Sequence, residues 1–285
     1  MTGEPFQLTL PQRRTTSVVF ASPHSGRDYP EGFLRRSVLN KREIRSSEDA
    51  FVDELFAAAP RFGAPLLAAT FPRAYVDLNR SSDELDPALI ERVAKGAINP
   101  RVASGLGVIP RVVANGRAIY RGKLPRAEAE ERLKKVWQPY HRRLAELLGE
   151  SHAMFGEAIL IDCHSMPHEA IEAISRGRAG PDIVLGDRFG ASADGRITDR
   201  IEAAFAGAGL KVVRNAPFAG AFTTQHYGRP SRNQHVVQVE IDRSLYMDES
   251  RLRPNGGFAE LQKLLEGVIA EIASIGRNRQ PLAAE

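Results

Sequence analysis

Two histidines stand where an apolar run of the sequence ends. In VVFASPHSGRDYP, residues 18–30, a β-branched run gives way to a turn-forming segment that begins at Pro23 and carries His24. In AILIDCHSMP, residues 158–167, His164 follows a second apolar run in the same way. Taken alone, His24 is better explained as a loop residue making one hydrogen bond. Because α/β folds bind ligands at the ends of their strands, the repeated pattern predicts that both histidines meet at one site.

Strand alternation assigns the side chains of the second run to opposite faces. Asp162 and His164 project to one side, and Cys163 projects to the other. A carboxylate and an imidazole therefore stand together near the end of this strand. The pair is explained equally well as a structural contact or as part of a site.

A carboxylate also interrupts the apolar segment VVQVEIDRSLYM, residues 236–247. Gln238, Glu240 and Asp242 alternate with apolar residues that face the other way. A glutamate in so apolar a strand is costly unless it is paired or functional. Glu240 is therefore the candidate for proton transfer.

A metal site would need a further ligand, because catalytic zinc usually keeps three protein ligands and one position for water. The segment SSEDAFVDELF, residues 46–56, offers Glu48, Asp49 and Asp53 at a predicted helix start. Acidic residues also occupy helix N-termini for purely structural reasons. The residues alone leave both explanations open.

Two polar segments are candidates for substrate contacts. RAYVDLNRSSDELDP, residues 73–87, places Asn79 beside Arg80, and arginine captures carboxylates through two parallel hydrogen bonds. The alternative is a surface ion pair between Arg80 and the acidic residues that follow. GAFTTQHYGRP, residues 220–230, is turn-rich and contributes His226 and Arg229.

The elements that position these residues alternate along the chain. Helical segments separate most of the predicted strands, which indicates a mainly parallel α/β sheet with helices on both faces, in one domain over residues 1–285. Residues 126–155 and 258–275 carry apolar side chains at helical spacing, and Pro139 is expected to interrupt the first of these helices. Residues 81–123 are irregular and are expected to form a lid or binding loop. The strands are expected at residues 17–22, 65–71, 74–78, 158–162, 182–185, 210–214 and 236–241.

Composition narrows the class of protein. The formal net charge is +4 over 285 residues and the basic residues are scattered, so no nucleic-acid partner is indicated. A single cysteine excludes an internal disulfide and suits a reducing compartment. No signal peptide or membrane span is evident, so we expect a cytoplasmic protein that acts on a small molecule. The oligomeric state stays open.

Together these segments resemble the N-formylglutamate amidohydrolase family, also called the N-formylglutamate deformylases. The matching residues run in order along nearly the whole chain: PHSG at 23–26, Asp49, YVDLNR at 75–80, WQPYH at 137–141, DCHS at 162–165, HYGRP at 226–230, VQVE at 237–240 and YM at 246–247. The family is similar in fold to the zinc carboxypeptidases, whose first ligand pair is His-x-x-Glu. Here Arg27 stands in place of that glutamate, so the carboxylate ligand must come from elsewhere.

The resemblance implies a metal-dependent hydrolase that splits N-formyl-L-glutamate into formate and L-glutamate, a step of histidine degradation. It implies one Zn²⁺ per chain, or another divalent ion, held by His24, Asp49 and His164, with Glu48 the second choice for the carboxylate. It implies that Glu240 transfers the proton. The residues expected to contact the substrate are Asn79, Arg80, Arg73, His226 and Arg229.

Three other interpretations compete with this one. The first is a zinc-dependent deacylase or carboxypeptidase acting on another N-acyl amino acid or on short peptides. The second is a thiol hydrolase that uses Cys163, which strand alternation opposes because it turns the thiol away from His164. The third is a non-catalytic module that binds anions through Asn79 and Arg80.

Overall fold

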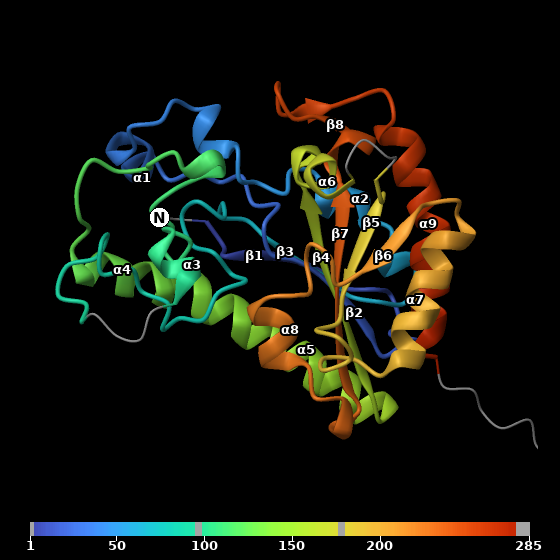
Figure 1. Ribbon diagram of the computed structural model, residues 1–285. Coiled ribbons are helices and arrows are strands. Elements are labelled where there is room, and N and C mark those ends of the chain that lie inside the picture. The colour runs from blue at the N-terminus through green and yellow to red at the C-terminus, as the bar shows by residue number, and fades with distance from the viewer. Residues whose placement is uncertain (1–2, 95–98, 176–179, 278–285) are drawn as a thin grey trace, which may run out of the picture.

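A seven-stranded sheet forms the centre of the molecule in the computed structural model, which describes residues 3–94, 99–175 and 180–277 (Figure 1). Its strand order is β1-β3-β2-β4-β7-β5-β6. The strands are β1 (Phe6–Thr9), β2 (Val18–Ser22), β3 (Leu66–Ala69), β4 (Ala158–Met166), β5 (Ile183–Gly186), β6 (Val212–Arg214) and β7 (Gln234–Asp242).

Most neighbouring strands are parallel. β2 pairs in parallel with β3 and with β4, β4 with β7, and β5 with β6. β1 is antiparallel to β3, and β5 is antiparallel to β7. The predicted mainly parallel mixed sheet is therefore confirmed. Because β2, β4 and β7 run the same way side by side, their C-terminal ends lie along one edge of the sheet.

Helices cover both faces of this sheet. The long helix α5 packs on β2 and β4, while α9 packs on β2 and on α7, which covers β5 and β6 (Figure 1). A small hairpin of β8 (Met247–Asp248) and β9 (Arg253–Pro254) precedes α9. The helices are α1 (Glu31–Arg36), α2 (Val52–Leu55), α3 (Pro100–Ala103), α4 (Arg126–Arg132), α5 (Gln138–Phe155), α6 (His168–Ser175), α7 (Gly195–Gly207), α8 (Phe222–Tyr227) and α9 (Phe258–Ile275).

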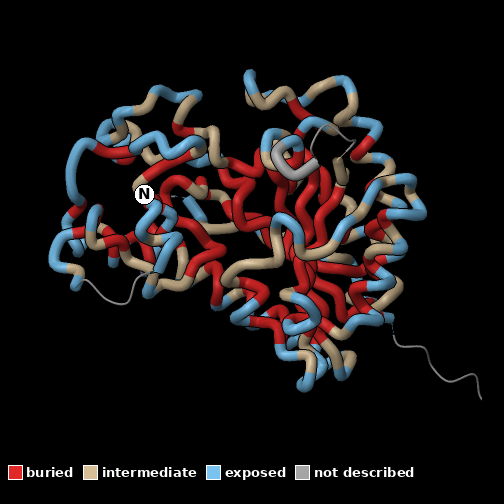
Figure 2. The backbone as a smooth tube through the Cα atoms, in the orientation of Figure 1, coloured by how far each residue is buried: buried red, intermediate tan, exposed pale blue. Residues whose placement is uncertain are grey.

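The sheet separates two apolar clusters, and its inner strands β2 and β4 are buried throughout (Figure 2). Along β4, Leu160 packs into the cluster under α5, whereas Ile161 and Cys163 pack into the cluster under α9. The predicted alternation is therefore correct for this strand. Asp162 and His164 consequently lie on the α5 face, away from the thiol.

Two strand predictions differ from the structure. Residues 74–78 form a buried turn in which the amides of Tyr75 and Val76 donate to the carbonyl of Pro72. Their apolar side chains lie in the core, but their backbone does not pair with the sheet. The apolar composition that suggested a strand therefore reflects burial alone. The edge strand β1 was not predicted, because it is short and only half-buried on alternate residues.

Pro139 interrupts the long helical segment as expected. α4 ends at Arg132, a π-helical turn spans Leu133–Trp137, and α5 then begins at Gln138 with Pro139 in its first turn. Proline has no amide hydrogen and its ring collides with the carbonyl four residues earlier, so a regular helix cannot pass through it. The widened turn accommodates both effects.

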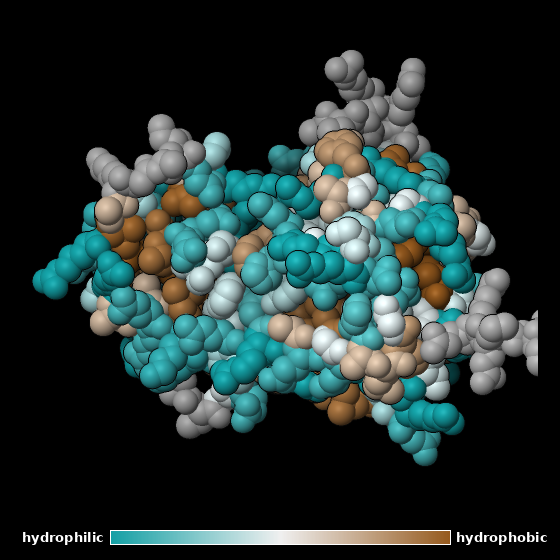
Figure 3. Space-filling view, turned by 90° about the horizontal axis from the view of Figure 1, so that it is seen from below, coloured by the Kyte–Doolittle hydropathy of each residue, from teal (hydrophilic) through white to brown (hydrophobic). Residues whose placement is uncertain are grey.

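The surface carries its large apolar side chains singly. On the face seen from below, hydrophilic residues predominate and apolar patches are separate (Figure 3). No helix in the described ranges is long and apolar enough to cross a membrane. The exposed large apolar residues are Leu10, Val38, Leu106, Met154, Phe189 and Val213.

A close backbone approach fixes the turn that carries His24. A Cβ atom placed on Gly26 would lie 2.1 Å from the carbonyl oxygen of Phe71. We therefore expect Gly26→Ala to lower the free energy of unfolding by about 1–3 kcal/mol or more, the cost that is typical of overpacked sites. Gly149, exposed in α5 with nothing within 4 Å of its Cβ position, is the control. Gly149→Ala should raise the free energy of unfolding, by up to about 1 kcal/mol in urea titrations. Equal stabilities of the two variants would contradict the close approach.

Burial should also protect the only thiol. Cys163 is fully buried, and burial raises the pKa of its thiol well above the ordinary value. Because the thiolate is the nucleophile, iodoacetamide should not label the native protein within the time that labels the urea-unfolded chain at one site. Mass spectrometry of the intact protein measures the labelling. Rapid modification of the native protein would revive the thiol mechanism.

Candidate active site

A pocket of ≈ 740 Å³ lies at the C-terminal ends of β2, β4 and β7. It is on the α5 face of the sheet, where alternate residues of β4 and β7 are polar. The pocket brings together side chains that lie up to 219 residues apart in the sequence, from His24 to Arg243. Its ionisable and amide side chains are His24, Asp49, Arg73, Asp77, Asn79, Arg80, Arg101, Asn115, His164, Gln238, Glu240 and Arg243.

His24 leaves the end of β2 in a buried loop. Its carbonyl accepts a hydrogen bond from the amide of Asp49 at 3.0 Å, so the two backbones are joined beside their side chains. Its Nε2 lies 2.8 Å from Oδ1 of Asp77. Because a carboxylate only accepts, Nε2 carries a proton in this contact, and a ring that is protonated there alone keeps a lone pair on Nδ1.

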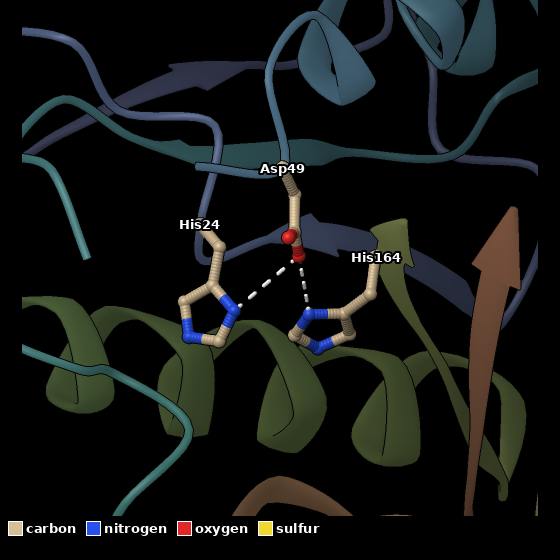
Figure 4. A group of neighbouring side chains, drawn as sticks. All are labelled: His24, Asp49 and His164. Atoms are coloured by element: carbon tan, nitrogen blue, oxygen red, sulfur yellow. Dashed lines mark hydrogen bonds and ion pairs between the residues drawn. The ribbon is translucent and has the colours of Figure 1, made fainter. Parts of the chain in front are cut away.

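The carboxylate of Asp49 lies between the imidazole rings of His24 and His164 (Figure 4). Its Oδ2 is 3.4 Å from Nδ1 of His24 and 2.9 Å from Nδ1 of His164. All three side chains are buried, and one possible ligand atom from each lies within 4.8 Å of the others. Within the described ranges, Nδ1 of His24 has no hydrogen-bond partner, although a carboxylate oxygen faces it. A lone pair and a carboxylate at this separation repel each other unless a positive charge lies near both.

Each histidine is also backed by an outer carboxylate. Asp77 contacts Nε2 of His24, and Oδ2 of Asp162 lies 3.1 Å from Nε2 of His164. Burial acts to lower the pKa of His164, but Asp162 and Asp49 outweigh it and hold that pKa well above the ordinary value. Carboxylates behind imidazole ligands fix the rings and raise their basicity in metal sites. Histidine nitrogens and a carboxylate oxygen with this backing suit a divalent metal ion such as zinc.

Arg243 neutralises the other side of Asp49. Its Nη2 donates to Oδ1 of Asp49 at 2.9 Å, and its Nε donates to Oγ of Ser165 at 3.2 Å. Burial acts to raise the pKa of Asp49, but its contacts with His164 and His24 outweigh burial and hold the pKa well below the ordinary value. Asp49 is therefore ionised. The sequence analysis missed Arg243, although it directly follows the polar alternation of β7 in the sequence EIDR.

Glu48 does not lie with the histidines. Its carboxylate accepts hydrogen bonds from Nε and Nη2 of Arg45, each at 2.9 Å, and another from the hydroxyl of Tyr29 at 2.5 Å. Glu48 is 2% exposed and its acceptors are engaged by these two residues. Of the two adjacent acids, the structure therefore places Asp49 in the pocket and Glu48 in a structural contact.

Strand register places Glu240 beside His164. The two residues are direct partners in the parallel pairing of β4 with β7, and Asp162 is the partner of Gln238. Oε1 of Glu240 accepts a hydrogen bond from Nε2 of Gln238 at 2.8 Å. Burial raises the pKa of Glu240 to about 7, and the nearby charge of Asp49 adds to the effect while that of His164 opposes it. A carboxyl group with such a pKa can both accept and return a proton near neutral pH.

Asn79 and Arg80 have different surroundings. Oδ1 of Asn79 accepts from the amide of Thr223 at 2.8 Å, and its Nδ2 lies 3.2 Å from Nε2 of His164. The side chain of Arg80 is 7% exposed, and its Nε lies 4.0 Å from Oδ2 of Asp77 without a hydrogen bond in the described ranges. Asn79 is thus held by the protein, whereas Arg80 keeps a buried donor for a ligand.

Helix α5 and the preceding π-helical turn hold this segment in place. Nε1 of Trp137 donates to the carbonyl of Arg80 at 2.9 Å. Nε2 of His141 donates to the carbonyl of Leu78 at 2.9 Å, so its Nδ1 accepts from the hydroxyl of Tyr227 at the same distance. Burial lowers the pKa of His141 to about 3, which keeps the ring neutral. His141 therefore positions the loop and carries no charge.

The remaining predicted contact residues divide between two cavities. Arg73 lines the pocket, where its Nε donates to Oδ2 of Asp77 at 3.0 Å. His226 and Arg229 line an adjoining cavity instead, together with Arg80. The irregular segment predicted as a binding loop contributes residues 101, 104, 106, 110 and 112–116 to the pocket.

Sequence and structure comparisons agree on the relatives of this chain. The sequence model of the N-formylglutamate amidohydrolase family matches residues 16–247. The chain is 34% identical to the N-formylglutamate deformylase of Pseudomonas aeruginosa over 264 residues, 92% of each chain, and 30% identical to that of Pseudomonas putida over 236 residues, 82% of each.

A solved structure extends this similarity to three dimensions. The N-formylglutamate amidohydrolase of Ralstonia eutropha JMP134 superposes with a TM-score of 0.89 at 37% identity, covering 96% of this chain and 99% of that one. Sequence and fold therefore agree over nearly the full length, and the chain belongs to the N-formylglutamate amidohydrolase family.

Proposed function

We propose that this protein hydrolyses the N-formyl amide of N-formyl-L-glutamate to formate and L-glutamate with the help of a bound divalent metal ion. The observation that carries the proposal is the buried group of His24, Asp49 and His164 with Glu240 next to it on the neighbouring strand. The choice of N-formyl-L-glutamate as the substrate rests on the relatives named N-formylglutamate deformylase. In the reaction water adds to the formyl carbon, the C–N bond breaks, and the amine leaves with a proton.

We propose Zn²⁺ as the metal, with one ion per chain held by His24, Asp49 and His164. A bound zinc ion lowers the pKa of water and polarises a carbonyl group. Asp77 and Asp162 orient the two histidine rings from behind, and Arg243 holds the carboxylate of Asp49. The protein thus supplies a fixed set of ligand atoms whose orientation is set before the metal or the substrate binds.

Glu240 moves the proton in this proposal. It accepts a proton from the attacking water and returns it to the amine nitrogen as the C–N bond breaks. Its pKa of about 7 supports both steps, because neither form is strongly favoured near neutral pH. Gln238 holds the carboxylate through one hydrogen bond and leaves its second oxygen for the reacting water.

Arg80 binds a carboxylate of the substrate in this proposal, with Arg73 as a second positive charge in the pocket. A guanidinium group offers a planar pair of donors that matches a carboxylate. Arg80 is the better placed of the two, because Arg73 already donates to Asp77. Asn79, next to Arg80 in the sequence, contacts His164 and Thr223 and so links the segment that carries Arg80 to the metal site of this proposal.

The direct test is release of formate from N-formyl-L-glutamate by the metal-loaded protein. Chelation followed by dialysis should abolish the activity, and stoichiometric Zn²⁺ should restore it. N-acetyl-L-glutamate is the comparison substrate, since a general deacylase would process both at similar rates. Full activity of the chelated protein would contradict the metal requirement.

Replacement of a proposed ligand should remove the metal. We expect His24→Ala, His164→Ala and Asp49→Ala each to lower bound zinc well below one ion per chain, measured by plasma mass spectrometry, and to abolish formate release. Glu48→Gln is the matched control, because Glu48 neighbours Asp49 but contacts Arg45 and Tyr29. The control should keep its zinc. Loss of zinc in Glu48→Gln with retention in Asp49→Ala would move the ligand to Glu48.

Replacement of the proposed proton carrier should leave the metal in place. Glu240→Gln keeps the shape and the contact with Gln238 but cannot accept a proton, so kcat should fall by about 10²–10⁴-fold at unchanged zinc content. Asp242→Asn is the control, because Asp242 lies on the same face of β7 but outside the pocket. It should keep nearly full kcat. A Glu240→Gln enzyme that turns over normally would exclude this role.

A further inference from the structure

A second cavity, of ≈ 680 Å³, adjoins the catalytic pocket. The two share four lining residues, Arg80, Arg101, Gly220 and Ala221, so the guanidinium of Arg80 stands at the boundary between them. The second cavity lies between the segments around residues 80–84, 99–101, 188 and 220–229. A molecule anchored at Arg80 can therefore extend from one cavity into the other. We call this second cavity the basic chamber.

The basic chamber carries a strong excess of positive charge. Four arginines line it, namely Arg80, Arg101, Arg188 and Arg229, against the single carboxylate of Glu84. Both oxygens of that carboxylate are engaged, one by the amide of Ser81 at 3.1 Å and the other by the side chain of Asn99 at 3.3 Å. In the described ranges, no carboxylate lies within 4.0 Å of the guanidinium nitrogens of Arg101, Arg188 or Arg229. The chamber is therefore complementary to an anion.

Arg80 brings to the chamber a buried hydrogen-bond donor that the described part of the protein leaves without an acceptor. Nε of Arg80 is buried without a hydrogen bond in the described ranges, and the side chain is 93% buried, given its exposure of 7%. Burial lowers the pKa of Arg80, and the positive charges of Arg101 and Arg73 act in the same direction against Asp77. A buried donor that is left without a partner is unfavourable, so a ligand that accepts a hydrogen bond from it gains in affinity.

The backbone that carries Arg188 is held in an unusual conformation. Arg188 and Phe189 both lie in the left-handed region, with φ of +53° and +57°. The side chain of Asn215 holds this turn by accepting from the amides of Asp187 and Phe189. The amide of Arg188 donates to the carbonyl of Ala219 at 2.8 Å, next to the shared wall of the two cavities. These bonds fix the position from which Arg188 reaches the chamber.

We propose that the basic chamber binds a second carboxylate of the substrate, and that Arg188 and Arg101 set the preference for N-formyl amino acids with an acidic side chain. This inference rests on the proposed deformylase function. In this proposal, the formyl amide and the α-carboxylate of the substrate lie in the catalytic pocket. The side chain of the substrate passes Arg80, so its carboxylate lies in the basic chamber. A charged carboxylate gains charge-assisted hydrogen bonds there, whereas a neutral side chain leaves the arginines without a partner.

The test compares two nearly isosteric substrates, N-formyl-L-glutamate and N-formyl-L-glutamine. Arg188→Gln and Arg101→Gln should each lower kcat/KM for the glutamate substrate by about 10- to 100-fold, mainly through KM, and change that for the glutamine substrate little. Arg196→Gln is the matched control, because Arg196 is exposed on α7 and lines neither cavity. Equal losses on both substrates, or no loss in either chamber variant, would overturn the proposal.

A binding measurement separates this inference from the proposed reaction. Titration calorimetry of the metal-loaded protein should show tighter binding of L-glutamate than of L-glutamine, and Arg188→Gln should remove that difference. If the wild type releases formate but binds both ligands equally, the chamber proposal fails and the deformylase function stands. If the wild type releases no formate while Arg188→Gln still abolishes selective glutamate binding, the deformylase function fails and the anion site stands.

Discussion

The structure of the candidate site depends on one buried carboxylate. Asp49 is 1% exposed and ionised, and it contacts two imidazole rings through one oxygen and Arg243 through the other. An ionised carboxylate is stable at this depth only with compensating positive charge and hydrogen bonds. Arg243 compensates the charge of Asp49 at Oδ1. At Oδ2 the carboxylate faces the two imidazole rings, and no arginine or lysine donates a hydrogen bond to that oxygen in the described ranges. The same constraint explains why three distant segments converge on this point.

Parallel strand register then determines what lies next to that carboxylate. β4 and β7 are neighbours with their C-terminal ends together, so the pair of Asp162 and Gln238 precedes the pair of His164 and Glu240 on one face. A shift of β7 by one residue against β4 would turn Gln238 and Glu240 into the apolar cluster under α9. The apolar alternate residues of both strands fix the register, because they must remain in that cluster. Packing on one face of the sheet therefore fixes the chemistry on the other.

This division explains how much the sequence alone could predict. Period-two alternation in the central strands predicted the faces of Asp162, His164 and Glu240 correctly, because a buried strand obeys it strictly. The local sequence could not decide between Glu48 and Asp49, since both are acidic residues just before a predicted helix. Only their contacts in the fold, Glu48 with Arg45 and Asp49 with His164, distinguish them. Contacts between loops depend on tertiary packing that no local pattern encodes.

Two further misses have the same origin. Residues 74–78 are buried and all apolar except Asp77, and that composition is compatible with a strand or with the turn that the structure shows. Arg243 follows β7 in a 3₁₀ turn, where a basic residue is usually solvated, so nothing in its local sequence marks it as buried. Its 5% exposure is explained by its contacts with Asp49, 194 residues earlier, and with Ser165, both distant in the sequence.

The arginines around the pocket show how one region can attract both a cation and anions. Arg73 donates to Asp77 and Arg243 donates to Asp49, so the charge of each arginine is compensated by a buried carboxylate of the protein. Arg80 lies at the limit of ion-pair distance from Asp77, and Arg188 has no carboxylate within that distance in the described ranges. The carboxylates of Asp49, Asp77 and Asp162 therefore gather around the two histidines, whereas the arginines without a close carboxylate partner lie from Arg80 outward. The proposed N-acyl amino acid substrate fits this arrangement, because its amide can approach the two histidines while its carboxylates remain among the arginines.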